Sequence, residues 1–357
     1  MTKPSISLTK PNILETTLRD GSYAINFQFT AADTRSICHG LEEAGFELIE
    51  IGHGVGLGAS QRGQGEAAET DEGYCQAAAS ALTKAHYGMF CIPGIARLED
   101  VDMAAEHGMG FIRIGTNVTE VAESQPFIER ARELGMFVFS NFMKSYAVEP
   151  REFAAFAQQS IQYGSQSIYI VDSAGGMLPH ELQGYINAVR DVGAPFAFHG
   201  HNNLGLAVGN SLTAHAAGAC LIDGSLLGMG RSSGNAPTEQ LVAALHRQGL
   251  AQGIDLIKTL DLGAQYIKPL HTTNEWRDID LITGLALFHS SYMKKIRTYA
   301  GRYEVDPRLL IIEVCKRDKV NAPDELVEEV ARSLAENHAE VGLGRFSLHQ
   351  YFGTEQS

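Results

Sequence analysis

Arg19 and Asp20 follow a short apolar run, ILETT at residues 13–17, and they are the first groups in the chain whose position suggests chemistry. Two opposite charges at the tip of a buried strand are costly unless something engages them. Further along, the run FHGH places His199 and His201 two residues apart. A carboxylate, a guanidinium and two imidazoles are therefore available to a single site.

The His199 and His201 pair has the spacing of two metal ligands. Residues two apart on a strand share a face and lie about 7 Å apart, so both imidazoles can reach one cation. Asp20 would add a hard oxygen ligand. Two His and one carboxylate leave three octahedral positions for water or a chelating substrate, which suits Mn, Mg, Fe or Co better than a closed structural zinc site. Since a lone His at a strand end is usually structural, the prediction of a metal rests on the combination with Asp20.

These residues lie at the ends of apolar, β-branched runs that recur along the chain. Eight runs are present, at residues 13–17, 46–53, 87–93, 110–115, 136–142, 167–173, 196–201 and 221–226. Stretches with helical character separate them, beginning near Thr, Pro or Asp and ending at Gly. This alternation over about 250 residues predicts a (β/α)8 TIM barrel, whose chemistry collects at the C-terminal strand ends. An open doubly wound sheet is the alternative, but no GxGxxG follows the first strand.

The alternation of strand-like and helix-like segments ends at about residue 255. From there apolar residues recur at helical spacing, in segments that begin near Pro or Asp. We therefore expect two domains: a catalytic barrel over residues 1–262 and a helical C-terminal domain over residues 263–357.

Composition narrows the class of protein. With 357 residues, 44% hydrophobic and 20% charged, the chain has the composition of an ordinary globular protein. A formal net charge of -14 argues against nucleic-acid and anionic-membrane partners, because both bind surfaces with clustered Lys and Arg. The five cysteines form no CxxC motif, and no signal region or apolar run of about 18 residues is present. We expect a cytoplasmic protein that acts on small molecules.

Two of the candidate residues could have a purely structural role instead of a functional one. Arg19 could act in catalysis or could merely pair with Asp20 or another carboxylate. His53 lies in GHGVGLG, where the glycines allow a ligand to approach closely, but the same sequence could form a tight loop between strand and helix.

Five motifs carry a resemblance to a known family. They are TLRDG, IEIGHGVGLGAS, YIVDSAGG, HGHNNLGLAVGNS and GMGRSSGNAPTE. Together they resemble the metal-dependent pyruvate aldolases of the 4-hydroxy-2-oxovalerate aldolase type. These aldolases share a TIM-barrel lyase superfamily with 3-hydroxy-3-methylglutaryl-CoA lyase and the isopropylmalate and homocitrate synthases. The resemblance spans nearly the whole chain, and the continuation SYAINFQF is similar to the aldolase branch rather than to the synthases.

The resemblance implies a metal site and a reaction. Asp20, His199 and His201 would hold a divalent ion, Mn or Mg in the first place and Co or Fe as alternatives, with Asn235 as an additional contact. The reaction would cleave a 4-hydroxy-2-oxo acid into pyruvate and an aldehyde, or form it from them. A 4-hydroxy-2-oxo acid can chelate one cation through its carboxylate and 2-oxo oxygens, so that the metal polarises the carbonyl.

The resemblance implies substrate contacts from two residues outside the ligand set. Arg19 would steady the negative charge that develops on the 2-oxygen of the enolate. Ser173 would lie near the substrate carboxylate. Apart from the resemblance, we predict that His53 and the metal ligand His199 also contact the substrate.

One departure concerns the general base. The aldolases that this chain resembles carry a His shortly after Arg-Asp-Gly, where this chain has Tyr23, and a Tyr in the C-terminal segment, where this chain has His289 in LFHSSYM. A Tyr with a pKa of about 10 is a poor base at neutral pH, whereas His titrates near 6.5. We predict that His289 is the relocated base and Tyr23 a hydrogen-bond donor, against the alternative that both residues only pack. Val55, where relatives often have Asp, suggests an altered aldehyde.

Other functions remain open at this point. One is a Claisen-type acyl-CoA synthase or lyase, which would need cationic contacts for the CoA phosphates. Another is a paralogue that binds metal without catalysis. A metal hydrolase also uses HxH in a barrel, but commonly on the first strand. The resemblance further implies a homo-oligomer and an acylating aldehyde dehydrogenase as a possible partner.

Overall fold

The computed structural model describes residues 6, 8, 12–270 and 278–337, and its larger part is a closed barrel of parallel strands. Each strand pairs with the next one in the sequence, and β8 closes the barrel against β1. The strands are β1 (Asn12–Glu15), β2 (Leu48–Glu50), β3 (His86–Cys91), β4 (Phe111–Asn117), β5 (Phe137–Met143), β6 (Ser167–Asp172), β7 (Phe196–Gly200) and β8 (Leu221–Gly224). The predicted TIM barrel is therefore confirmed.

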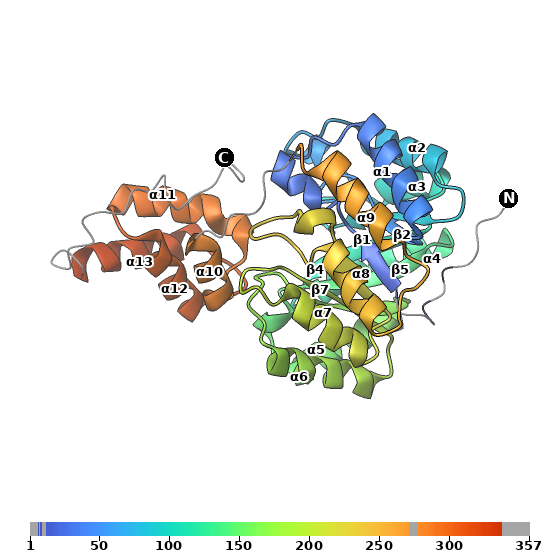
Figure 1. Ribbon diagram of the computed structural model, residues 1–357. Helices are drawn as coiled ribbons and strands as arrows, with labels where there is room; N and C mark the ends of the chain where they lie inside the picture. The colour runs from blue at the N-terminus through green and yellow to red at the C-terminus, as the bar shows by residue number, and fades with distance from the viewer. Residues whose placement is uncertain (1–5, 7, 9–11, 271–277, 338–357) are drawn as a thin grey trace.

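A helix follows each strand and covers the outside of the barrel (Figure 1). The helices are α1 (Ala31–Ala44), α2 (Asp71–Ala81), α3 (Leu98–Glu106), α4 (Gln125–Glu133), α5 (Pro150–Tyr163), α6 (Pro179–Val192), α7 (Ala207–Ala216) and α8 (Thr238–Arg247). Local sequence fixes their ends. At α1, Thr30 and Asp33 form a reciprocal capping box and Gly45 ends the helix at a φ of 98°. No helix among the described residues is long and apolar enough to cross a membrane.

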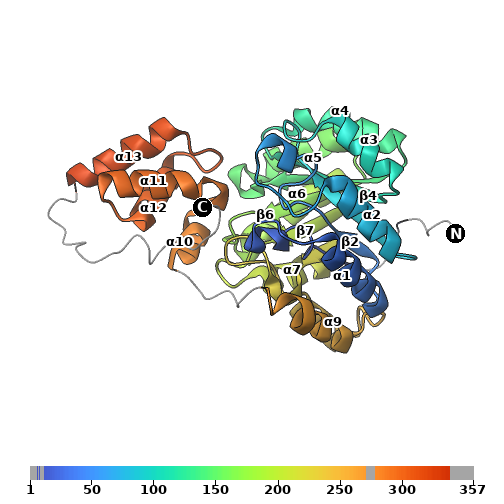
Figure 2. The same ribbon diagram turned by 90° about the horizontal axis from the view of Figure 1, so that it is seen from above.

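Helices after the barrel form a second unit with its own core. They are α10 (Asp278–Ala286), α11 (Met293–Tyr303), α12 (Pro307–Arg317) and α13 (Asp324–Asn337), and they lie beside the barrel in both views (Figures 1 and 2). By contrast, α9 (Leu256–Leu262) packs on α1 and α8, and Ile267 belongs to the barrel core. The change of core falls between residues 267 and 279. Residues 271–277 are outside the described residues, so the boundary at residue 262 stays a prediction.

The first C-terminal helical segment is interrupted where the sequence pattern indicates continuous helix. Leu287 has a φ of 56°, and the Phe288 amide donates to the Thr283 carbonyl in a tight turn. The short helix η7 (Ser290–Tyr292) and then α11 follow. The interruption places His289 at a turn, from which its side chain reaches the barrel.

The interior of the barrel changes from apolar to polar along the strands. Side chains two residues apart share a face, so Ala197, His199 and His201 follow one another along β7 toward its C-terminal end. The apolar end is filled by one buried cluster of Leu14, Leu48, Phe111, Phe139, Tyr169, Val171, Ala197, Cys220 and Leu221. Two positions after Leu48, Phe111 and Leu221 come the charged residues Glu50, Arg113 and Asp223, all buried.

The C-terminal unit covers the polar end of the barrel. Asn203, in the loop after β7, donates from Nδ2 to the Asp280 carbonyl at 3.0 Å and to Thr283 Oγ1 at 2.8 Å on α10. Lys144, directly after β5, donates from Nζ to the Tyr292 hydroxyl at 2.8 Å. Residues of the C-terminal unit therefore help to enclose the end where the candidate site lies.

Candidate functional site

Asp20, His199 and His201 meet at the C-terminal end of the barrel. Each offers a ligand atom, and these atoms all lie within 4.8 Å of one another. All three side chains are buried. Asp20 enters from the turn after β1, while the alternation of β7 brings both imidazoles to the same side with their ring centroids 5.1 Å apart. The structure thus brings together the carboxylate and the two imidazoles that the sequence pattern singled out.

A closed ring of buried charges supports two of these side chains. Arg19 pairs with Asp20 at 3.3 Å and with Glu50 at 2.8 Å, and Glu50 also pairs with Arg113 at 2.8 Å. Arg113 is fully buried.

The ring continues across the barrel and returns to Asp20. Arg113 contacts Asp223 at 2.8 Å, Asp223 contacts His199 Nδ1 at 2.8 Å, and His199 Nε2 lies 3.2 Å from Asp20 Oδ2. Glu50, Arg113 and Asp223 are not among the residues that the sequence motifs singled out. A signal was present in the sequence, because Arg113 and Asp223 are each the one charged residue of an apolar strand run, and Glu50 lies between two isoleucines.

The contact that closes the ring, between His199 Nε2 and Asp20 Oδ2, requires a positive charge. A neutral imidazole has one N–H, and Nδ1 of His199 faces the Asp223 carboxylate, so Nε2 can face the Asp20 carboxylate only as an imidazolium or with a metal between them. Burial lowers the pKa of His199, but its contacts with Asp20 and Asp223 outweigh burial and raise it above the ordinary 6.5. Burial alone would raise the pKa of Asp20, yet Arg19 and His199 hold it well below its usual range.

Three buried polar atoms at this point fit a metal ion. Apart from the 3.2 Å contact of Asp20 Oδ2 with His199 Nε2, the atoms Asp20 Oδ2, His201 Nδ1 and Asn235 Oδ1 have no hydrogen-bond partner among the described residues. Such atoms are rare in folded proteins unless something else engages them. Asn235 is held next to His201 by a β-bridge, and its Nδ2 donates to the Met229 carbonyl at 3.3 Å. Burial lowers the pKa of His201 to about 3, so its imidazole is neutral and ready to ligate.

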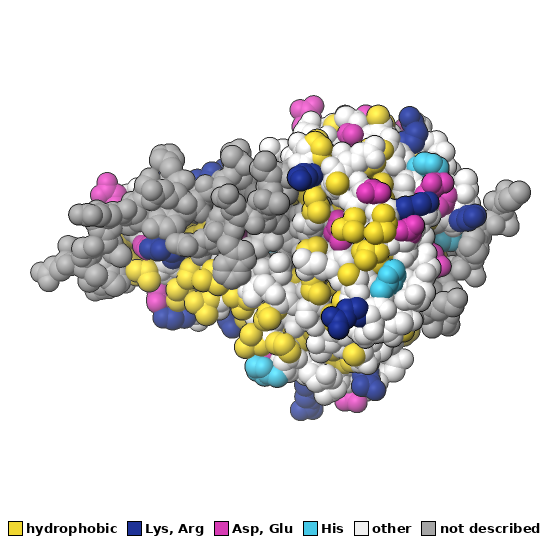
Figure 3. All heavy atoms as spheres, in the orientation of Figure 1, with side chains coloured by type: hydrophobic (Ala, Val, Ile, Leu, Met, Phe, Trp, Pro, Cys, Tyr) yellow, Lys and Arg dark blue, Asp and Glu magenta, His cyan; other side chains and the backbone are white. Residues whose placement is uncertain are grey.

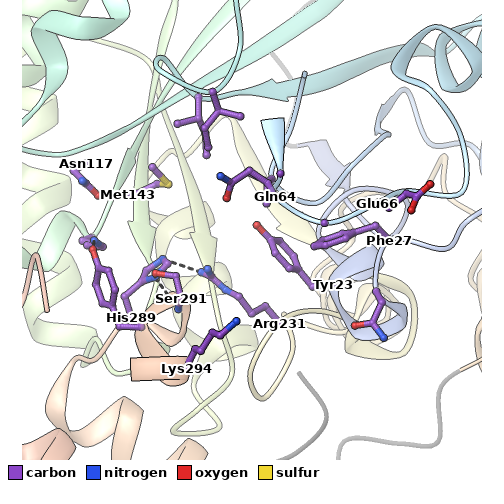
Figure 4. A pocket seen from close by; sticks show the side chains of 18 of the residues that line it. Tyr23, Phe27, Gln64, Glu66, Asn117, Met143, Arg231, His289, Ser291 and Lys294 are labelled. Carbon is purple, nitrogen blue, oxygen red and sulfur yellow. Dashed lines mark hydrogen bonds between the residues drawn. The ribbon is translucent and has the colours of Figure 1, made fainter. Parts of the chain in front are cut away.

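Two cavities lead outward from this cluster. The inner one, of about 50 Å³, is lined by Asp20, His199, His201 and Ser173 among others. The outer one, of about 780 Å³, opens beyond it and is shown in Figure 4.

Tyr23, Arg231 and His289 line both cavities, together with Ile92 and Met143. They therefore stand where a substrate bound in the inner cavity would extend outward. Arg231 lies inside the GMGRSSGNAP motif, but no sequence pattern marked it as a candidate site residue.

Arg19 is both a structural partner and a group open to substrate. Its guanidinium lies over the face of Phe90 at 4.8 Å, and its contacts with Glu50, Asp20 and the Gly54 carbonyl use Nε and Nη1. Burial would lower its pKa, but Glu50 and Asp20 raise it, so the side chain is a permanent cation. Arg19 lines the inner cavity, and its contacts with Glu50, Asp20 and Gly54 do not involve its Nη2, so Nη2 can donate to a ligand there.

His289 and Tyr23 lie on the same side of the site. Arg231 Nη2 donates to His289 Nε2 at 3.0 Å, so Nε2 is the acceptor of this contact, while His289 Nδ1 lies 2.6 Å from Ser291 Oγ and 3.2 Å from the Ser291 amide. Burial, together with Arg231 and Lys144, lowers the pKa of His289 well below 6.5. Burial raises the pKa of Tyr23, which makes it a donor rather than a base.

Ser173 and His53 differ in their access to the site. Ser173 lines the inner cavity, and its hydroxyl accepts from the Lys144 amide at 3.0 Å. His53 lines neither cavity: its Nδ1 accepts from the Val55 amide at 3.1 Å, and its Nε2 lies 3.2 Å from the Gly65 carbonyl. Its ring stacks on Phe27 at 3.8 Å, which favours the tight-loop interpretation.

The match to known proteins covers most of the chain. A family model described as HMGL-like matches residues 10–265. A protein of Pelotomaculum thermopropionicum named 4-hydroxy-2-oxovalerate aldolase is 39% identical over 336 residues, covering 93% of this chain and 98% of that protein. A protein of the same name from Carboxydothermus hydrogenoformans is 37% identical over 328 residues, covering 91% and 98%. The resemblance inferred from the motifs is therefore confirmed.

Solved structures share the barrel at low sequence identity. The HMG-CoA lyase of Bacillus subtilis has a TM-score of 0.65 at 19% identity, covering 77% of this chain and 97% of that one. The carboxyl transferase domain of Rhizobium etli pyruvate carboxylase, with pyruvate and biocytin, has a TM-score of 0.74 at 14% identity, covering 93% and 61%. These similarities concern the fold.

Metal binding should displace a proton from His199. Because the pKa of His199 is raised above 6.5, this imidazole carries a proton below that pKa and must lose it to ligate. The apparent Kd for Mn should therefore rise by about tenfold for each pH unit below that pKa and level off above it. Calorimetric titration with Mn in buffers of different ionisation enthalpy measures both the affinity and the protons released. Binding that releases no proton at any pH from 5 to 8 would contradict this assignment.

Proposed function

Because this chain belongs to the HMGL-like family, we propose that it is a divalent-metal-dependent aldolase acting on 4-hydroxy-2-oxo acids. It would cleave them to pyruvate and an aldehyde, or run the reverse condensation. The observation that carries the proposal is the buried meeting of Asp20, His199 and His201 beside an open cavity. The aldolase name of relatives that match nearly the whole chain supports the reaction class.

We propose Mn or Mg as the ion, with Co or Fe as alternatives. One carboxylate and two imidazoles, with Asn235 Oδ1 as an additional contact, leave coordination positions for an oxygen-rich substrate. Once bound, a divalent ion supplies Lewis acidity toward the 2-oxo group of the substrate. Asp223 would orient His199 through Nδ1, the outer contact that usually fixes a metal-binding imidazole.

The chain's own residues would supply the remaining steps of cleavage. The base takes the proton of the 4-hydroxyl group, the C3–C4 bond breaks to give the aldehyde, and its electron pair moves toward the 2-oxygen. Arg19 meets the charge that develops there, since its guanidinium is already fixed by Glu50 and Asp20 and need not reorganise. Ser173 lines the inner cavity and would hydrogen-bond the substrate carboxylate.

We assign the base to His289 and a donor role to Tyr23. His289 is neutral, and its Nε2 carries the lone pair, although Arg231 occupies that lone pair in this structure. Tyr23 keeps its proton because burial raises its pKa, so it can donate to a substrate oxygen. The exchange of residue types between the two positions is thus compatible with the same chemistry.

The family resemblance and the exposed apolar side chains both suggest partner proteins. Hydrophobic side chains gather over α9 and over the C-terminal helices (Figure 3). Ile257 on α9 and Leu285 on α10 are each 65% exposed. Apolar faces of this kind suit protein contacts, and we propose a homo-oligomer with a possible acylating aldehyde dehydrogenase partner. A cytoplasmic location stays a prediction from the sequence.

Pyruvate release tests the proposed reaction. A panel of racemic 4-hydroxy-2-oxo acids is incubated with the protein and Mn or Mg, and pyruvate is followed with lactate dehydrogenase. We expect metal-dependent release that falls by more than about a hundredfold in Asp20→Asn. Even the loss of a residue that only hydrogen-bonds a metal ligand lowers metal affinity or activity by about 10-fold to 100-fold. Asp191→Asn makes the same substitution at an exposed residue and is the control. Binding of metal without release from any member would contradict the aldolase and direct the search to acyl-CoA substrates or a binding role.

The assignment of the base is tested by two substitutions. His289→Ala should lower kcat by about 10²-fold to 10⁴-fold, the usual contribution of a general base, while Tyr23→Phe should mainly raise KM because it loses a donor. His180→Ala, on the exposed surface, is the matched control. Steady-state kinetics with the best substrate of the panel give both constants. Unchanged turnover in both variants would show that the two side chains only pack.

A further inference from the structure

Cations gather at the outer cavity of a protein that is acidic as a whole. Arg231, Lys144 and Lys294 all line this cavity, and Glu66 is the one carboxylate among its described lining residues. The chain has a formal net charge of -14, so chance would favour the opposite balance. A concave site with an excess of one charge concentrates ligands of the other sign.

Arg231 is a guanidinium held by neutral groups. Its Nη2 donates to His289 Nε2 at 3.0 Å, and its charge lies 5.5 Å from the centre of the Tyr23 ring. Its Nε is buried without a hydrogen-bond partner among the described residues, and no carboxylate there pairs with it. Since Arg in proteins is usually matched by carboxylate or phosphate in a forked geometry, this side chain is a donor available to an anion.

The two lysines extend the positive surface outward. Lys144 is buried, and its Nζ donates to the Tyr292 hydroxyl and the Val320 carbonyl, which are both neutral. Burial lowers its pKa to about 8, so it remains largely protonated at neutral pH. Lys294 is exposed on α11 and projects on the same side of the cavity as Arg231 (Figure 4). Glu120 and Asp318 lie near enough to favour the charged form of Lys144, but Arg231 opposes it, and a bound anion would relieve that repulsion between like charges.

The position of these cations relative to the reacting centre defines what they would bind. The 2-oxo acid end of the substrate belongs in the inner cavity with Arg19 and the ligand cluster. Arg231 lines both cavities, whereas Lys144 and Lys294 line only the outer one. A group that reaches them must therefore lie on the far side of C4, in the fragment that leaves as the aldehyde.

We propose that the aldehyde carries an anionic group, a carboxylate or a phosphate, that binds between Arg231 and the two lysines. The proposal rests on the aldolase function. It narrows the substrates to 4-hydroxy-2-oxo acids with a second negative charge beyond C4. An anion that draws Arg231 away from His289 also frees the Nε2 lone pair, so the base is released only when the correct substrate fills the outer cavity.

Matched aldehyde pairs test this proposal in the condensation direction. The Mn-loaded protein is given pyruvate with acetaldehyde or glyoxylate, butanal or succinic semialdehyde, and glyceraldehyde or glyceraldehyde 3-phosphate. We expect the charged member of at least one pair to have the higher kcat/KM by about tenfold to a hundredfold, the contribution of charge-assisted hydrogen bonds. Comparison of the two carboxylate-bearing aldehyde pairs with the phosphate-bearing pair shows which of the two anions the site prefers. Arg231→Met should bring the preferred ratio close to one.

A control and a second measurement separate this proposal from the aldolase function. Lys316→Met removes the same charge from the exposed surface of α12 and should leave the ratio unchanged. Turnover of neutral aldehydes that equals or exceeds that of every charged partner would overturn the anion subsite and leave the aldolase standing. If no aldehyde reacts, calorimetry with succinate and with inorganic phosphate decides: binding to the wild type that is lost in Arg231→Met supports the subsite, and equal or no binding overturns it.

Discussion

The buried ring of alternating charges is the constraint on which the site depends. Asp20, Arg19, Glu50, Arg113, Asp223 and His199 contact one another in that order and close on Asp20. Removing charges from water is expensive, and a buried pair is stable only when its geometry and hydrogen bonds are good. Arg113 illustrates the compensation, because its guanidinium also donates to Asn141 Oδ1 at 2.8 Å and lies over the Tyr169 ring at 4.1 Å. Loss of any one member would leave its neighbours as uncompensated buried charges.

The ring also explains why a cation belongs between His199 and Asp20. Its carboxylates carry three negative charges and its arginines two positive ones, so the balance closes when His199 is protonated or a metal takes the place of that proton. Glu50 and Asp223 fix the directions of Arg19 and His199 before any ligand arrives. The same contacts that stabilise the barrel interior therefore preorganise the groups proposed to act on the substrate, which is the arrangement that electrostatic catalysis needs.

Sequence reasoning recovered the parts of this account that periodicity and motif spacing encode. Strand and helix alternation predicted the barrel, and the two-residue spacing of His199 and His201 predicted their convergence with Asp20. Interactions between distant strands were harder: nothing near Arg113 in the sequence indicates that Glu50 and Asp223 lie on either side of it. The same holds for the turn at Leu287, where tertiary contacts of the C-terminal unit outweigh a helical pattern. Arg231 was overlooked because its significance lies in the lack of a carboxylate partner within the described part of the chain, which no local sequence pattern reveals.

The central claim is that the ring delivers Asp20 and His199, with His201, to one divalent ion. The most direct measurement is an anomalous difference map from a crystal of the protein soaked in Mn, collected at a wavelength where Mn scatters anomalously. The account predicts a peak in contact with all three side chains, with His199 Nδ1 still on Asp223 and Arg19 still on Glu50. A peak bound by other residues, in a crystal of protein that Mn activates, would contradict it.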